Sequence, residues 1–368
     1  MNERYQEKSK KLTNPTIKGS YKEEDCIFLL KEIQDQIEED IETKEEKIRQ
    51  GVHYSEMLPT ESFPSQEYLA LFHESLKKSA EMIASYVATL AEIILKDKGK
   101  KVALVSLARA GTPIGVLVKR YIAFTYNIDV PHYSVSIIRG KGIDENALLY
   151  ILKEQGHDHL QFIDGWTGKG TIGRVLQESI HSFNEKYDTN ISSDLAVLSD
   201  PAHSAELWAT REDFFLPSAC LNSLVSGLIS RTVQREDLTG PHDFHAAKVY
   251  REWEKEDCSN DFIEQIVPYF KKNNDNFIVI DKTVTNRGWS EMENIQTSFG
   301  LKSMNSIKPG IGETTRVLLR RVPEKILVKD RTNPSVQHIL LLAKEKNVPV
   351  EIYEKMSYGC IGIIKEKN

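Results

Sequence analysis

Apolar residues recur along this chain with two different periods. Between residues 66 and 96 they follow helical spacing, as at Leu69, Phe72, Leu76, Ile83 and Leu90, which predicts a long amphipathic helix or a helix pair. From residue 101 onward, short apolar runs alternate with helical stretches. Strands are expected at 101–107, 132–138, 160–163, 195–198 and 277–280, and helices at 112–124, 147–155 and 172–183. Strands separated by such helices predict an α/β fold, with a parallel sheet and helices on both faces.

The two ends of the chain differ from this middle part. Residues 1–18 are polar and carry no apolar pattern, so we expect a disordered arm. Residues 19–290 form the predicted first domain, and residues 301–310 read as a linker. Residues 300–368 form a second, compact unit. In it we expect a glycine turn opening a helix within 308–321, a strand at 325–328, a helix at 336–346 and a strand at 350–353, followed by the stretch 359–364. A charged run at 40–50 is typical of a solvated helix.

Composition narrows the class of protein. The longest apolar runs are shorter than the roughly 18 residues of a membrane span, and the polar N-terminus lacks the pattern of a secretory signal. We therefore expect a cytoplasmic protein without a membrane partner. The cysteines Cys26, Cys220, Cys258 and Cys360 are too dispersed to predict a disulfide framework or a zinc site.

Charge is distributed unevenly over the two units. The chain has a net charge of −6, yet residues 300–368 hold 13 Lys and Arg against 7 Asp and Glu. A basic unit on an acidic body favours a polyanionic partner for the C-terminal part.

The first chemically informative turn follows the strand at 101–107. Small residues carry the chain from this strand into a helix, and they let backbone N–H groups and the helix N-terminus approach an anion. An arginine in the turn can add a charge-assisted contact. The turn resembles the pyrophosphate loop of type I phosphoribosyltransferases, and its candidate residues are Ala108, Arg109, Ala110, Gly111 and Thr112.

A second strand–turn–helix segment follows the strand at 160–163. It resembles the 5-phosphoribosyl-1-diphosphate (PRPP) motif of the same family, in which acidic residues hold the ribose hydroxyls and a loop cradles the 5′-phosphate. The resemblance implies that Asp164 is the acid, and Gly165 stands where the family has a second one. The implied phosphate cradle is Thr167, Gly168, Lys169, Gly170 and Thr171.

Between these turns, the strand at 132–138 ends in Arg139-Gly140-Lys141-Gly142. This stretch resembles the mobile basic loop that closes over the diphosphate in type I phosphoribosyltransferases, so Arg139 and Lys141 would neutralise the leaving group. Together the three segments imply phosphoribosyl transfer from PRPP, with Mg²⁺ as cofactor, to an unknown base-like acceptor. A non-catalytic nucleotide- or RNA-binding protein remains open, because Gly165 departs from the motif.

Longer phrases resemble one specific family. Residues 53–57, 106–113 and 213–245 are similar to proteins that are encoded with tellurite-resistance stress genes and are called either phosphoribosyltransferases or cysteine protease StiP. The second name directs attention to Cys220. A cysteine nucleophile needs a nearby base and a group that orients this base. Candidate bases are His203, His242 and His245, and candidate orienting groups are Asn222 and Asp243. A structural role for Cys220 is the competing interpretation.

The C-terminal unit begins with a glycine turn that opens a basic helix. It resembles the Pelota RNA-binding domain and the ribosomal proteins that bind kink-turn RNA, which carry Gly-x-Asn-Glu-x-x-Lys at this turn. Here Gly312 replaces the Asn. The resemblance implies a small α-β-α sandwich that binds RNA, and a packing role alone is the alternative. The candidate RNA-binding residues are Lys308, Gly310, Gly312, Glu313, Arg316 and Arg320. The sequence leaves open whether the chain forms a homo-oligomer.

Overall fold

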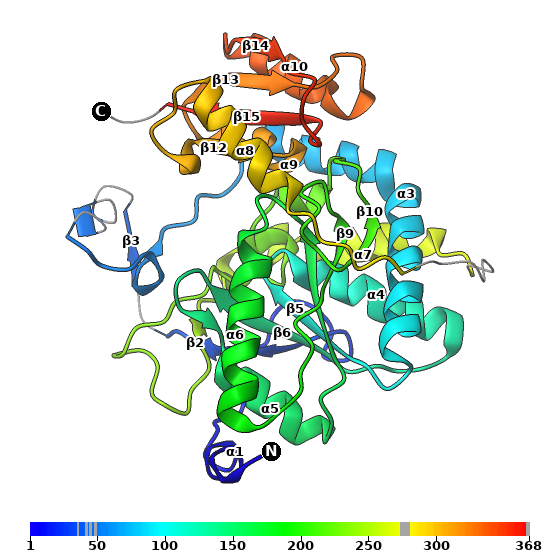
Figure 1. The fold of residues 1–368 in the computed structure, drawn as a ribbon, viewed down its shortest axis with the longest axis vertical. Coiled ribbons are helices and arrows are strands. Elements are labelled where there is room, and N and C mark those ends of the chain that lie inside the picture. The colour runs from blue at the N-terminus through cyan, green and yellow to red at the C-terminus, as the bar shows by residue number, and fades with distance from the viewer. Residues whose placement is uncertain (35–36, 41–42, 44–45, 48–49, 273–279, 366–368) are drawn as a thin grey trace.

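The computed structural model describes residues 1–34, 37–40, 43, 46–47, 50–272 and 280–365. Residues 277–279 of the strand predicted at 277–280, and much of the helix predicted at 40–50, lie outside the described residues. The described chain forms a first domain and, from residue 286, a C-terminal domain that packs on top of it (Figure 1).

A parallel sheet forms the centre of the first domain. Its strands run in the order β1 (Ile27–Leu29), β6 (His132–Ile138), β5 (Ala103–Ala108), β8 (Leu160–Trp166), β9 (Leu195–Ser199) and β10 (Leu207–Thr210). All neighbours in this order are parallel, and the short β7 (Gly142–Ile143) pairs with β6 in the antiparallel direction. This confirms the predicted α/β class. The carboxyl ends of β5, β6 and β8 therefore meet at one edge of the sheet.

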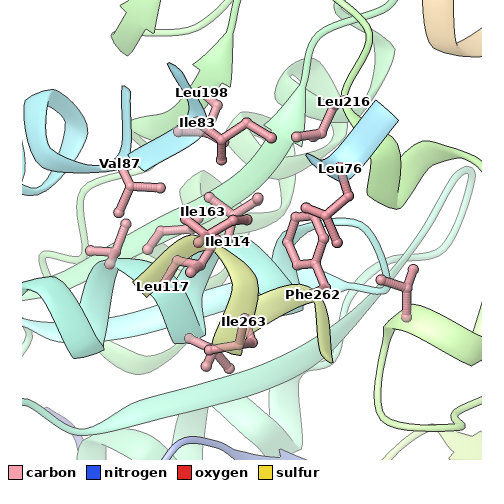
Figure 2. Close-up of a cluster of buried hydrophobic side chains, with 14 of the residues drawn as sticks. Leu76, Ile83, Val87, Ile114, Leu117, Ile163, Leu198, Leu216, Phe262 and Ile263 are labelled. Carbon is pink, nitrogen blue, oxygen red and sulfur yellow. The ribbon is translucent and has the colours of Figure 1, made fainter. Parts of the chain in front are cut away.

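Helices cover both faces of this sheet. On one face lie α3 (Gln66–Lys98), α4 (Gly111–Tyr126) and α7 (Ser259–Ile266). Figure 2 shows Leu76 and Ile83 of α3 packed with Leu117 of α4 and Ile163 of β8 in a buried apolar cluster. On the other face lie α5 (Glu145–Gln155) and α6 (Thr171–Tyr187), which share a second cluster.

The N-terminal residues are ordered, so the prediction of a disordered arm at 1–18 is wrong. Residues Glu3–Ser9 form α1, which packs against α5 and α6. Asn2 caps this helix, and Tyr5 is buried in the same cluster as α6. Hydrogen bonds from Asn2 to the carbonyl oxygens of Lys186 and Tyr187, together with the buried ring of Tyr5, hold a helix that is too short for a periodic signal.

Short pairs of strands flank the main sheet. The strand β2 (Lys31–Glu32) pairs with β11 (Ala246–Ala247), and β3 (Glu38–Glu39) pairs with β4 (Leu58–Pro59). Several single-turn 3₁₀ segments complete the first domain, including Pro217–Ala219 and Ser223–Val225.

The C-terminal domain is a three-layered sandwich. Its sheet has the order β12 (Ile307–Pro309), β15 (Cys360–Ile364), β13 (Pro323–Val328) and β14 (Val350–Ile352). The helices α9 (Ile311–Arg320) and α10 (Gln337–Glu345) share a buried cluster with Ile326 and Val328, whereas α8 (Arg287–Ser298) shares another with Leu327. The predicted linker at 301–310 is therefore wrong: residues 307–309 form a strand, and α8 moves the start of the domain from residue 300 to about residue 286.

The two domains bury apolar side chains against each other. Ile311 and Leu318 of α9 belong to the same buried cluster as Leu216 and Leu221 of the first domain. The C-terminal domain is thus packed against the first domain rather than tethered to it. Within the described residues, no helix has both the length and the apolarity that crossing a membrane requires.

Candidate functional site

The candidate site lies where the C-terminal domain meets the turns that follow β5 and β8. Tyr358 of the C-terminal domain donates a 2.5 Å hydrogen bond to the carbonyl oxygen of Gly168, and Lys169 donates to the carbonyl oxygen of Met304. The second domain thereby holds the loop that the sequence predicts to cradle a phosphate.

The turn after β5 brings backbone close to the neighbouring strand. Helix α4 starts at Gly111, and its N-cap Ala110 makes no side-chain capping bond, so the first N–H groups of the helix lack a side-chain acceptor from the cap. A Cβ atom at Gly111 would lie 2.2 Å from the carbonyl oxygen of Ile163, so only glycine permits this approach. Thr112 is fully buried and hydrogen-bonds Ser134 at 2.8 Å, which makes it a structural residue. The Ala108–Arg109 peptide bond is cis.

The guanidinium of Arg109 is paired with a carboxylate inside the first domain. Its Nη1 atom donates to Glu61 Oε2 at 2.7 Å and to the carbonyl oxygen of Ile229 at 3.1 Å. Burial acts to raise the pKa of Glu61, but Arg109 and Ser223 together hold that pKa below its ordinary value. The predicted direct contact between Arg109 and a diphosphate is therefore not set up here, because Glu61 already compensates the guanidinium.

A buried serine–histidine pair supports the same turn. In the neutral ring, His132 Nδ1–H donates to the carbonyl oxygen of Asp25 at 2.7 Å, and Nε2 accepts from Ser106 Oγ at 2.8 Å. Burial lowers the pKa of His132 to about 4, which keeps the imidazole neutral. Because both side chains lie inside the sheet, this pair is structural rather than nucleophilic.

Asp164 stands at the end of β8, as predicted. Its Oδ1 atom accepts from the Gly165 N–H at 2.8 Å, and burial raises the pKa of the carboxyl group to about 7. Position 165 faces Leu216, whose Cδ2 atom would lie 3.4 Å from an added Cβ. The carbonyl oxygen of Ala110 would lie at the same distance, so an acidic side chain at this position would start beside a backbone oxygen and an apolar side chain.

In the predicted phosphate cradle, some groups bond within the protein and others remain able to bind a phosphate. The Thr167 hydroxyl donates to Asp200 at 2.6 Å and accepts from the Ala202 N–H at 3.2 Å, so the predicted phosphate contact through Thr167 is replaced by an internal anchor. Helix α6 begins at Thr171, and its N-cap Gly170 makes no side-chain capping bond. The N-terminus of α6 therefore offers backbone N–H groups and positive potential at the cradle.

Cations from both domains gather beside this cradle. Burial lowers the pKa of Lys169 to about 8, with further lowering by the charges of Lys308 and Arg139. Burial likewise lowers the pKa of Lys308. Lys308 was predicted to bind RNA, but the structure places it near the phosphate loop. Since like charges in close proximity cost free energy, an anion bound among them would be stabilised.

The basic loop after β6 is split between two environments. The guanidinium of Arg139 lies 5.5 Å from the ring centre of Tyr54, and that of Arg231 lies 5.0 Å from the same ring. Burial lowers the pKa of Arg231, and the charges of Arg109 and Arg139 add to this effect. Lys141, by contrast, bonds Glu56 at 3.2 Å, so its predicted role at the leaving group is not prepared.

Arg231 is a site residue that the sequence reasoning missed. It lies in the 213–245 segment that carried the family resemblance, but a lone arginine in an irregular stretch gives no periodic signal. Arg231 and Arg139 are brought together by tertiary packing, since both guanidinium groups lie close to the ring of Tyr54.

Cys220 lacks the surroundings of a nucleophile. Its side chain is 0% exposed, and burial raises the pKa of its thiol to about 12. The charged groups that act on it are Arg320 and Arg316. The candidate base His245 instead bonds Ser136 at 2.9 Å through Nδ1. Within the described chain, the structure assembles no cysteine–histidine pair at Cys220, and the structural interpretation fits better.

The turn predicted to bind RNA is occupied by the first domain. Gly310, with φ 94°, precedes α9, and both carboxylate oxygens of Asp213 lie 3.1 Å from the Ile311 N–H. Asp213 also accepts from the Gly359 N–H at 2.8 Å. Burial raises the pKa of Asp213 to about 6. A carboxylate from the first domain thus caps the helix N-terminus that an RNA phosphate was expected to meet.

The other predicted RNA-binding residues also point to the first domain. A Cβ atom at Gly312 would lie 3.0 Å from Ala219. Arg316 bonds Glu313 at 2.8 Å and Asn222 Oδ1 at 3.1 Å, and Arg320 donates to the carbonyl oxygen of Cys220 at 3.3 Å. Gly312 and Arg316 therefore contact the first domain, whereas Arg320 stays exposed although it also bonds that domain, and RNA binding through this face stays a prediction.

Magnesium fits the site only as a partner of a phosphorylated ligand. The described residues contain no cluster of three or more metal-ligating side chains. Mg²⁺ in phosphate-handling sites commonly uses one or two carboxylates and completes its shell with substrate phosphates and water. Asp164 is the residue that would hold such an ion. Burial raises the pKa of its carboxyl group, and no neighbouring cation of the described chain lowers this pKa.

Comparison with known proteins places this geometry in a family. The model described as "Tellurite-like stress resistance cysteine protease StiP" matches residues 19–267, and the Pelota RNA-binding domain matches residues 286–366. A protein of Acinetobacter baylyi named "Cysteine protease StiP" is 33% identical over 348 residues, which are 91% of this chain and 90% of that protein.

A solved structure of a mutant hypoxanthine phosphoribosyltransferase from Trypanosoma cruzi, in complex with the product IMP, covers 50% of this chain and 89% of its own, with 12% identity and a TM-score of 0.26. So distant a likeness bears on neither reaction nor substrate. The family match and the relative, which spans nearly the whole chain, are decisive: the chain belongs to the StiP stress-resistance family and carries a Pelota RNA-binding domain at its C-terminal end.

Proposed function

We propose that the first domain binds Mg²⁺-PRPP and transfers its phosphoribosyl group to a base-like acceptor, with release of diphosphate. The observation that supports this proposal is the pair of helix N-termini without side-chain caps, at α4 and α6, which follow the adjacent strands β5 and β8. PRPP carries phosphate groups at two ends of one ribose, and two neighbouring anion sites suit such a ligand.

The cations of the site support the same ligand. Lys169 and Lys308 flank the α6 turn, and Arg139 lies near both lysines as well as Arg231. In this proposal the α6 turn takes the 5′-phosphate, Asp164 contacts the ribose hydroxyls and Mg²⁺, and Arg139 with Arg231 stabilises the departing diphosphate. Fixed charges and dipoles that face a departing anion are an effective source of catalysis.

Calorimetry tests the proposal directly. Titration of Mg²⁺-PRPP into the protein should give saturable binding, and Lys169→Ala should weaken it by about tenfold because a charged phosphate contact is lost. Lys153→Ala, on an exposed position of α5, is the matched control and should bind like the wild type. Asp164→Asn should weaken binding less and suppress turnover. Absence of binding at millimolar PRPP would refute the transferase proposal.

The relative's name suggests a cysteine peptidase as the other class of enzyme. A peptidase that uses Cys220 would need this thiol to become exposed and to lose its proton at neutral pH. The buried thiol, with its pKa raised to about 12, gives this alternative no support.

We also propose that the C-terminal domain binds RNA, through lysines outside the docked turn. Lys329, Lys344, Lys346 and Lys355 are exposed on this domain. Filter binding of kink-turn and duplex RNA at several salt concentrations tests this. The double substitution Lys344→Ala and Lys346→Ala should reduce the salt slope by about two phosphate contacts. Equal and weak binding of both RNAs by wild type and variant would leave the domain a packing role.

A further inference from the structure

A cavity lies between the two domains, beside the turn that follows β5. Its volume is about 190 Å³, and it is lined by Arg109, Ala110, Trp166, Ser218, Asn222 and Arg316, among others. Arg109 and Ala110 belong to the candidate diphosphate turn, whereas Arg316 comes from α9 of the C-terminal domain. The cavity therefore borders the proposed PRPP site and is completed by the second domain.

Hydrogen-bonding groups are fixed in its wall. The Arg316 guanidinium is held by Glu313 and by Asn222 Oδ1, and these two bonds use only part of its five N–H donors. Ser218 is 7% exposed, and its hydroxyl has no hydrogen-bond partner among the described residues. A buried hydroxyl without a partner costs free energy, and a ligand that bonds it would recover this cost.

Apolar side chains form much of the remaining wall. The half-buried indole of Trp166 and the ring of Pro113 line the cavity. The volume is below the roughly 300 to 1,000 Å³ of pockets that hold drug-sized ligands. A cavity of this volume suits one small ring system rather than a peptide segment.

We propose that this cavity is the acceptor subsite, and that it takes an oxo-substituted nitrogen heterocycle of the nucleobase class, with Arg316 and Ser218 as its specificity residues. The proposal rests on the proposed function. The base would stack on Trp166, and its oxo group would accept from Arg316. In the reaction, a ring nitrogen forms a bond to C1 of the ribose, the C1–oxygen bond to the diphosphate breaks, and the proton of that nitrogen passes to solvent.

The C-terminal domain thereby becomes part of the transferase site. An RNA-binding domain that supplies one wall of the acceptor subsite allows the base to come from two sources, a free base or an unpaired base of a bound RNA. The chemistry that the cavity recognises is the same in both cases.

Tryptophan fluorescence measures binding in this cavity without turnover. Hypoxanthine and uracil are titrated into the full chain in one arm and short single-stranded RNAs of the same bases in the other, each with and without Mg²⁺-diphosphate. Quenching should saturate in at least one arm, and Trp166→Phe should remove it. An RNA-only response identifies RNA as the source of the base, and a free-base response identifies the free base. Absence of Trp166-dependent quenching in both arms would overturn the subsite.

Substitutions separate recognition from folding. Ser218→Ala removes a hydroxyl that bonds no described residue, so the fold should be retained while base affinity falls by about threefold to tenfold. Arg316→Met should weaken base binding by about tenfold or more, and Arg321→Met, at an exposed position after the same helix, is its control.

Calorimetry with Mg²⁺-PRPP on the same variants distinguishes the two proposals. PRPP binding that is unchanged by Ser218→Ala, together with weakened base binding, supports the subsite. PRPP binding without any base binding overturns the subsite and leaves the proposed function standing. Base binding without PRPP binding refutes the proposed function and retains a base-binding cavity.

Discussion

The lowered pKa of Lys169 makes anion binding at the cradle depend on pH in a predictable direction. Burial and the neighbouring charges of Lys308 and Arg139 bring this pKa to about 8, from an ordinary value of 10.5. The difference corresponds to about 3 kcal/mol by which the free protein disfavours the protonated lysine, compared with a lysine in water. A bound anion compensates this charge and returns the pKa toward its ordinary value.

Affinity should therefore be full well below pH 8, fall to about half of that value near pH 8, and decrease by about twenty-fold between pH 7.5 and 9.5 if the bound-state pKa is fully restored. Sulfate is the cleanest probe, because its own charge is constant over this range, and PRPP should behave in the same way. Calorimetry or a thermal-shift titration at four pH values measures the effect.

Two variants test the cause. Lys169→Arg should bind with little pH dependence, because a guanidinium stays protonated throughout this range. Lys308→Ala removes a charge that lowers the pKa of Lys169, so the decrease in affinity should begin at higher pH. A wild-type affinity that is constant from pH 7.5 to 9.5, or an equal decrease in Lys169→Arg, would refute the assignment of this pKa to the anion site.

Two further predictions concern groups at the domain interface. Because burial raises the pKa of the Cys220 thiol to about 12, Cys220 should react with iodoacetamide about a thousandfold more slowly than a free thiol at pH 8. The variant Cys220→Ser should retain PRPP binding. Rapid alkylation that depends on one of the three candidate histidines would instead indicate a peptidase. The carboxyl group of Asp213 has a folded-state pKa of about 6, above its ordinary 3.8, so its contribution to stability increases as the pH falls. Asp213→Asn should lack this contribution. In urea unfolding, the free energy of unfolding of the wild type should increase by about 2 kcal/mol relative to that of the variant as the pH falls from 7 to 4.5. Parallel pH profiles would contradict the burial of this carboxylate.

The parallel sheet was predictable because its strands and helices are long enough to show their periods. The run at 132–138 matches β6 residue for residue, and the helix predicted at 112–124 corresponds to α4. α1 escaped prediction because it is short and is held by tertiary contacts, namely the buried ring of Tyr5 and the hydrogen bonds of Asn2. The strand β12 escaped prediction because three residues in a polar stretch give no alternation.

The sequence predicted the positions of those site residues that local strand–turn–helix geometry places. Asp164 and Lys169 lie at the carboxyl edge of the sheet because strand–turn–helix geometry fixes them there. The compensation of Arg109 by Glu61, 48 positions away, depends on tertiary packing that no motif encodes. The same holds for Asp213, which reaches α9 across 98 positions.

The position of Asp213 gives the Pelota-type turn a structural role in this chain. A glycine turn followed by a helix N-terminus attracts any anion, and its N–H groups do not distinguish a phosphate from a carboxylate. In this chain the first domain supplies the anion, and the surrounding apolar burial makes the contact part of the folded body. The α9 face then carries Arg316 to the wall of the interdomain cavity. The turn that usually identifies an RNA-binding surface therefore positions a side chain for the proposed acceptor subsite, and RNA must engage the domain elsewhere or displace Asp213.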